Sequence, residues 1–144
     1  MSNAFAGVGT RFRRWNATTT EYEDIAEVKT ISGPGMSRDV IDVTSLDSTG
    51  GWREFIAGFR NAGTVVLNMN FTRATYTKMW DDFEDDDLKH YEIVLSDPEN
   101  TTIEFAGLVT ELPVNVSADD AVTNDCTIQI SGAPVINSGA SSGL

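Results

Sequence analysis

The chain has 144 residues, which suits a single domain that buries about two-thirds of its unfolded surface. Its formal net charge is −12, and residues 73–144 carry fourteen acids against three bases. A chain this acidic is unsuited to binding nucleic acid by counterion release. The apolar runs are only a few residues long, so we expect neither an export signal nor a membrane-spanning segment.

The residues that usually carry chemistry are scarce. A lone cysteine, Cys126, excludes a disulfide within the chain, and its alternating context favours a buried strand position. Together with the only histidine, His90, it cannot supply the three or four ligands of a zinc site. The Gly33-Pro34-Gly35 turn is too short and too constrained by proline to cradle a phosphate. We therefore expect no enzyme, no cofactor and no metal.

The N-terminal part predicts an arm followed by a strand. Residues 1–9 are small and glycine-rich, as in a flexible arm. Residues 10–15 hold three arginines around Phe12 and Trp15, a pattern that can contact nucleic acid. We favour instead a strand whose arginines pair with acids on a neighbouring element or subunit.

Two short strands and a polar loop follow. Residues 26–31 alternate as a half-exposed strand, which the Gly33-Pro34-Gly35 turn ends, and 40–43 predict a second strand. Residues 44–51 are rich in serine, threonine, aspartate and glycine, which is typical of a loop. Four large apolar residues lie in 52–59. This stretch either folds back as a short helical turn onto its own core or docks on a neighbouring subunit.

A strand and an amphipathic helix form the centre of the chain. Residues 65–71 alternate with a period of two, with Val65, Leu67, Met69 and Phe71 on one face. Residues 73–85 predict a helix capped by Thr72. Its apolar stripe consists of Tyr76, Met79, Trp80 and Phe83.

The acidic run 81–87 at the helix end opposes the helix dipole. It suits a solvated helix end, a divalent cation site or an acidic surface that faces DNA or an arginine-bearing neighbour.

The C-terminal half predicts further strands. Residues 90–96 predict one, with Tyr91, Ile93 and Leu95 inward. Apolar positions change phase after residue 105, which predicts a bulge near 106–107. Residues 118–124 predict a polar hairpin connection, 126–130 the last strand, and 134–144 a flexible C-terminal arm after a single domain over 1–133.

The segment Val28-Lys-Thr-Ile-Ser-Gly-Pro-Gly-Met-Ser-Arg-Asp-Val-Ile-Asp-Val-Thr-Ser-Leu-Asp47, with its continuation through 51–63 to 65–71, resembles the central segment of phage major tail tube proteins of long non-contractile, siphovirus-type tails. The resemblance implies a mainly β fold, an antiparallel β-sandwich or partly open barrel with one α-helix. It also implies a structural virion protein whose homohexameric rings stack head-to-tail into the tail tube, a conduit for DNA delivery.

The expected sites follow from that picture. The inter-subunit assembly loop is expected to include Thr44, Leu46, Asp47, Trp52, Arg53, Phe55 and Ile56. Exposed strand positions that could place acids along the lumen are Glu92, Glu104 and Glu111. Expected partners are other copies of the chain, the tail terminator, the tail-tip and tape-measure proteins, and passing genomic DNA without specific binding.

The expected location is the virion tail, assembled in the host bacterial cytoplasm. Two alternatives stay open on the sequence: a bacterial type VI-like secretion tube protein, and a monomeric β-sandwich binding module.

Overall fold

The structure is a computed structural model that describes residues 7, 9–25 and 28–137. The predicted arm at 1–9 lies mostly outside these residues. Within the described part, the chain forms ten strands, one α-helix (α1) and one short 3₁₀ helix (η1). The elements are β1 (Arg11–Asn16), β2 (Glu21–Asp24), β3 (Val28–Ser32), β4 (Ser37–Asp42), η1 (Thr49–Gly51), β5 (Phe55–Asn61), β6 (Thr64–Asn70), α1 (Arg73–Glu84), β7 (Lys89–Val94), β8 (Thr102–Glu111), β9 (Val114–Asn115) and β10 (Thr123–Asn137).

Eight strands form one antiparallel sheet in the order β2-β1-β7-β8-β10-β6-β3, with β9 paired to β10. The two ends of this path are close in sequence, because β2 ends at Asp24 and β3 begins at Val28. Four Cα steps span at most about 14 Å, so the sheet must curl until its end strands approach each other. The prediction of a mainly antiparallel β fold with one helix is confirmed, and the curl gives it the form of a partly open barrel.

The core lies on the concave face of this curled sheet. Its members alternate along β6, β7 and β10 as the period of two predicts, and Cys126 is buried among them as a small apolar residue. Phe12, Tyr91 and Phe105 stack at its centre, with ring centroids 5.6 to 6.5 Å apart. Phe71 lies beyond the end of β6 and is partly exposed, so the predicted inward face ends at Met69.

Helix α1 covers the core with a different face from the one that its apolar stripe predicts. Thr72 caps it as expected, since its hydroxyl accepts a hydrogen bond from the Thr75 backbone N–H. The buried helix residues, however, are Thr75, Met79 and Asp82. Only Met79 of the predicted stripe is buried, and Trp80 is 44% exposed. The reason is electrostatic, because Asp82 must turn inward to reach its partners.

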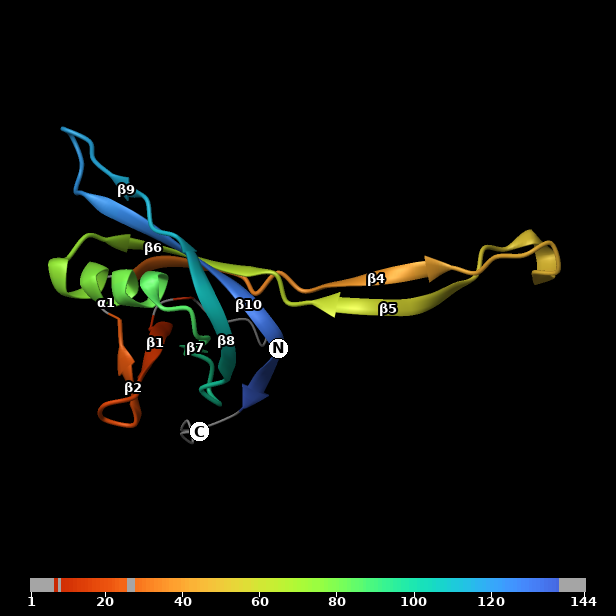
Figure 1. Cartoon of the computed structure of the whole chain (residues 1–144), viewed down its shortest axis with the longest axis horizontal. Coiled ribbons are helices and arrows are strands. Elements are labelled where there is room, and N and C mark those ends of the chain that lie inside the picture. Colours follow the sequence, from red (N-terminus) through yellow and green to blue (C-terminus); the bar gives the residue numbers. More distant parts are fainter. Residues whose placement is uncertain (1–6, 8, 26–27, 138–144) are drawn as a thin grey trace.

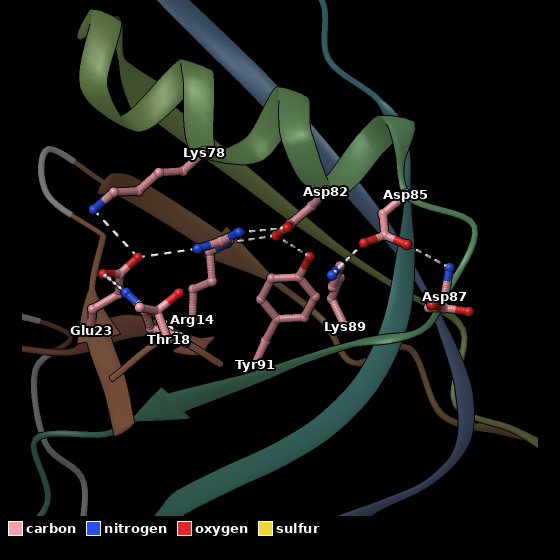
Figure 2. Close-up of polar contacts among 10 residues, drawn as sticks. Arg14, Thr18, Glu23, Lys78, Asp82, Asp85, Asp87, Lys89 and Tyr91 are labelled. Carbon is pink, nitrogen blue, oxygen red and sulfur yellow. Dashed lines mark hydrogen bonds and ion pairs between the residues drawn. The ribbon is translucent and has the colours of Figure 1, made fainter. Parts of the chain in front are cut away.

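Those partners form a polar network that joins α1 to three strands (Figure 2). Both oxygens of Asp82 accept hydrogen bonds from Arg14 at 2.7 Å, and Oδ2 also accepts one from the Tyr91 hydroxyl at 2.8 Å. Arg14 and Lys78 both contact Glu23 of β2. The hydrogen bonds to Asp82 raise the pKa of Arg14, and burial followed by the charge of Asp82 raises the pKa of Tyr91.

This network corrects the reading of the acidic run 81–87 as a wholly solvated helix end. One member, Asp82, is buried and paired, and Asp85 forms an ion pair with Lys89. Asp81, Asp86 and Asp87 are exposed, as a solvated end requires. The predicted pairing of the 10–15 arginines with acids on neighbouring elements is confirmed by Arg11, Arg13 and Arg14.

The register between β8 and β10 shifts at two places, and one of them adjoins Ala106, close to the position 106–107 that the sequence predicts. Val109 pairs with Ile128 but Glu111 pairs with Thr127, so Thr110 is the extra residue on β8. The other shift lies between the pairs Ala106–Ser131 and Glu104–Val135, where residues 132–134 of β10 stand opposite Phe105 alone. The extra residues there are on β10 and not on β8. The bulge at Thr110 leaves Glu111 facing away from the core and brings Leu112 against it, whereas Leu108 precedes the bulge and faces away from the core.

Strand β10 is also longer than predicted and continues to Asn137. The prediction that a flexible arm begins at 134 is therefore wrong for 134–137, and residues 138–144 lie outside the described part of the chain.

Candidate assembly surfaces

The most prominent surface is the hairpin of β4 and β5, which forms a separate two-stranded sheet. Figure 1 shows it leaving the domain as a long ribbon, with η1 at its far end. Pairing runs from Ser37 and Asn61 at the root to Asp42 and Phe55 near the tip. A lone two-stranded hairpin is marginally stable in water, so this ribbon calls for a surface that covers it.

The hairpin carries the largest set of exposed apolar side chains in the described chain. These are Met36, Val40, Ile41, Val43, Leu46, Trp52, Phe55, Ile56 and Phe59. Trp52 is 77% exposed and Phe59 is 89% exposed. The alternative in which 52–59 folds back as a helical turn onto its own core is therefore wrong. Residues 55–61 extend as β5 instead, and a contiguous apolar surface of this kind marks a protein contact.

The tip of the hairpin is ordered by its polar residues rather than by apolar packing. The Thr44 hydroxyl accepts a hydrogen bond from the Glu54 backbone N–H at 2.7 Å, and Asp42 accepts one from the Thr44 backbone N–H at 2.8 Å. Asp42 also pairs with Arg53 at 3.0 Å. The hydrogen bonds from Thr44 hold the pKa of Asp42 below its ordinary value. The tip thus holds Leu46 and Trp52 outward on a defined loop.

Glycines at the root fix the direction in which the hairpin leaves the sheet. Gly33 and Gly63 both have positive φ, at 109° and 74°. A Cβ at Gly33 would overlap the Thr64 carbonyl oxygen, and one at Gly63 would lie 2.5 Å from the Gly35 carbonyl oxygen. The two backbone segments at the root therefore lie closer together than a residue with a Cβ would allow.

A second surface is the convex face of the central strands, which is turned away from the core. Its paired positions on β6, β8 and β10 are mainly uncharged and polar, with two carboxylates and no lysine or arginine. They are Thr64, Val66, Asn68, Asn70, Ala106, Leu108, Glu111, Thr123, Asp125, Thr127, Gln129 and Ser131. Glu104 shares this face through its pairing with Val135 and is half-buried, whereas Glu111 is exposed.

Glu92 differs from these two acids. The prediction that it is an exposed strand position is wrong, because its side chain is fully buried. It lies opposite Arg13 on β1, whose guanidinium contacts Glu92 Oε1 at 2.9 Å. Burial, and then the charges of Glu104 and Glu92, raise the pKa of the nearby Tyr22. Alternation alone could not reveal this cover, because it comes from β1 and β2.

A third surface lies on the outward side of α1, and the sequence reading missed it as a surface. Phe71, Tyr76, Trp80 and Phe83 form a continuous row with ring centroids 5.1 to 6.2 Å apart. Tyr76 is anchored by a hydrogen bond to the Leu112 carbonyl oxygen, while the other three are partly exposed. The apolar stripe itself was the signal for this surface, although the sequence reading assigned it to the core.

Within residues 7, 9–25 and 28–137, no group of three or more histidine, cysteine or acidic side chains is placed to hold a metal ion. In the same residues, no helix has both the length and the apolarity to cross a membrane.

Comparison with known proteins gives one family and several solved structures. The family model described as lambda phage tail tube protein matches residues 4–137. None of the curated proteins matches the chain.

The chain is similar to a protein from the tail of an empty gene transfer agent particle, determined by helical refinement with C6 symmetry. They share 20% identity over 93% of this chain and 99% of that one, with a TM-score of 0.79. It is also similar to the SPP1 tail tube, at 12% identity over 96% and 81% of the two chains and a TM-score of 0.72.

A third likeness is to a chain of the sheath–tube complex of an extracellular contractile injection system. The identity is 13%, the covered shares are 96% and 94%, and the TM-score is 0.71. Identities this low establish a common fold and nothing finer.

Proposed function

Because this chain belongs to the lambda phage tail tube protein family, and is thus a structural component of the virion tail, we propose that six copies close into a ring and that rings stack head-to-tail into the tail tube. The C6 symmetry of the similar gene transfer agent tail supports the number six. The tube serves as the conduit through which DNA is delivered. The chain acts by assembly and not by catalysis.

The observation that carries this proposal is the uncovered β4–β5 hairpin. It extends well beyond the domain and exposes large apolar side chains over its whole length (Figure 1). If a second subunit is placed beside the first, displaced along the direction of the hairpin, the hairpin of the first subunit can lie over the second subunit. Such a contact joins two different surfaces and does not close, so it yields a filament. Trp52, Phe55 and Ile56, with Thr44, Leu46, Asp47 and Arg53 at the tip, form the projecting half of this contact.

Lateral contacts within a ring use the strands at the two ends of the sheet. Strand β2 carries Glu21, which forms no ion pair with a described residue, whereas β3 carries Lys29. These charges are complementary, and unpaired edge groups on both strands could be satisfied by pairing between neighbours. The aromatic row on α1, which is anchored at the Leu112 carbonyl oxygen, offers a further apolar contact.

The convex face of β6, β8 and β10 is proposed to line the lumen. Its paired positions are uncharged or carry carboxylates, and Glu111 and Glu104 repel DNA phosphates. Lys29 of β3 borders the face beside Asn68 and Thr123. Screening limits this repulsion to about 8 Å at physiological salt, which still matters in a narrow bore. DNA therefore passes without being bound.

The same assembly implies its partners and its place of formation. An open-ended stack needs a tail-tip complex to start it, a tape-measure protein to set its length and a terminator to stop it. Assembly takes place in the cytoplasm of the bacterial host, before the tail joins the particle.

The test removes the apolar contacts of the hairpin without touching the domain core. A Trp52→Ser, Ile56→Ser double variant should keep the far-UV circular dichroism and melting temperature of the parent chain, since both side chains are exposed. It should form no tubes by negative-stain electron microscopy, either as purified protein at high concentration or in particles complemented with the variant gene. Leu88→Ser, which removes a 45% exposed apolar side chain after α1, is the matched control. Normal tubes from the double variant, or a parent chain that never forms rings, would refute the proposal.

A further inference from the structure

Two arginines at the root of the hairpin face each other, and neither forms an ion pair with a residue that the structure describes. Arg38 of β4 pairs directly with Arg60 of β5, so both side chains stand on the same face of the ribbon, and both are exposed. Like charges in directly opposite positions destabilise a strand pair. Six of the ten basic residues form ion pairs within the described chain, and these two do not. In a chain with 22 acids, an uncompensated arginine pair points to an acidic group from elsewhere.

The arginine pair borders a depression of about 720 Å³. Its apolar lining comes from Met36 and Ala62 on the hairpin side and from the 132–134 bulge of β10, which contributes Ala133 and Pro134. A ligand for this depression should therefore combine a small apolar surface, which fills the depression, with negative charges that meet the two arginines at the rim of the depression.

The connection between β9 and β10 has that chemistry. Asp119 and Asp120 lie at its tip, are exposed, and form no ion pair with any described residue. Val116 and Val122 flank them and are 77% and 38% exposed. Small residues, Ala118 and Ala121, complete a narrow apolar knob with two carboxylates.

The knob and the depression cannot meet within one copy, because they lie at opposite ends of β10. The knob precedes Thr123 and the depression begins at Gly132, nine residues further along the strand. At the rise of a β-strand this separates them by about 30 Å. Figure 1 shows the β9–β10 tip on the side of the domain opposite to the projecting hairpin.

We propose that residues 116–122 of one copy dock into the depression at the hairpin root of the preceding copy in the stack, with Asp119 and Asp120 against Arg38 and Arg60. The direction follows from the geometry. When two copies are stacked so that the hairpin of the first lies over the second, the knob of the second copy comes close to the hairpin root of the first. This inference rests on the proposed stacking, and it names a second contact that fixes the rotation of each ring on its neighbour.

The test is a charge swap. The Arg38→Glu, Arg60→Glu variant and the Asp119→Arg, Asp120→Arg variant should each lower the yield of tubes by about tenfold or more, because like charges then meet at the interface. Combining all four substitutions should restore most of the yield. Arg73→Glu, at an arginine that also lacks an ion pair, is the control and should leave the yield unchanged.

Proximity is tested by crosslinking. Arg60→Cys combined with Asp120→Cys should give a ladder of disulfide-linked oligomers on oxidation of assembled tubes, since Cys126 is buried and stays unreactive. The pair Arg73→Cys and Asp120→Cys should not. Tubes that form normally in either charge-reversed variant, or a fourfold variant that is not restored, would overturn the inference while leaving the tube function intact.

Duplex DNA provides the competing outcome. If reversal at Arg38 and Arg60 abolishes DNA retention in a filter-binding assay while tubes form normally, the arginines bind phosphate and the docking inference is wrong. A parent chain that forms no tubes refutes the proposed function itself.

Discussion

At the scale of single residues, the position of α1 depends on one buried carboxylate. Asp82 is 1% exposed and accepts hydrogen bonds from two nitrogens of Arg14 and from Tyr91. A bidentate, charge-assisted pair of this kind is geometrically specific. Because Arg14 belongs to β1 and Tyr91 to β7, a single side chain fixes the rotation of the helix relative to both strands.

Replacing Asp82 by Asn should therefore destabilise the domain. The substitution leaves the Arg14 guanidinium, 17% exposed, without its principal counterion, and breaking a buried pair costs about 3 to 5 kcal/mol. Urea unfolding followed by tryptophan fluorescence measures the loss. Asp81→Asn, an exposed neighbour on the same helix, should stay within about 0.5 kcal/mol of the parent chain. Equal stabilities for the two variants would show that the pair contributes no net stability.

At the scale of elements, the hairpin and the helix both expose apolar groups that their sequences would place in a core. In the hairpin these groups stand on a ribbon that leaves the domain, and on α1 the electrostatic anchoring of Asp82 turns Trp80 and Phe83 outward. Both elements are amphipathic in the ordinary way. They differ from ordinary core elements in what covers their apolar faces. Under our proposal, another copy of the chain covers them.

The root of the hairpin gives an element-scale prediction. Gly63→Ala puts a Cβ against the Gly35 carbonyl oxygen at a residue with φ of 74°, so the variant combines backbone strain with overlap. We expect a loss of about 1 to 3 kcal/mol in urea unfolding, together with fewer tubes because the ribbon is redirected. Gly35→Ala meets no atom within 4 Å and should be close to neutral. A Gly63→Ala chain as stable as the Gly35→Ala chain would refute the role assigned to the root.

At the scale of the whole molecule, charge is distributed by surface. The arginines of β1 are neutralised within the subunit by Asp24, Glu92, Glu23 and Asp82. At the paired positions of β6, β8 and β10 on the convex face, the only charged residues are carboxylates. The arginine pair at the hairpin root lies apart from this face and from the arginines of β1. This separation suits a tube whose bore repels DNA while its joints use opposite charges.

Glu111→Lys tests the assignment of the bore. Repeated around each ring and along the stack, the substitution adds cations that bind phosphate, so DNA release should slow or stop while tail length stays the same. The measurement is the fraction of DNA released per particle, with tail length taken from micrographs. Asp86→Lys, at an exposed acid beyond α1, should leave release unchanged. Unaltered DNA release from Glu111→Lys particles would place β8 elsewhere than in the lumen wall.

The prediction from sequence held wherever one element decided the outcome. The cap at Thr72 and the inward positions of β10 and of β6 as far as Met69 follow from local spacing. It failed where two elements meet. Glu92 alternates like an exposed residue but is covered by Arg13, and the extra residues next to Ala106 lie on β10, not on β8.

By itself the sequence left open whether the apolar residues of 52–59 belong to the core, but it determined the mainly β class of the fold, the helix and the acidic balance. It did so because periodicity, caps and charge are properties of neighbouring residues. The tertiary structure alone decided the projection of the hairpin, the outward aromatic row of α1 and the opposition of Arg38 to Arg60. These depend on strand register and on contacts between residues far apart in the chain, which no local pattern specifies.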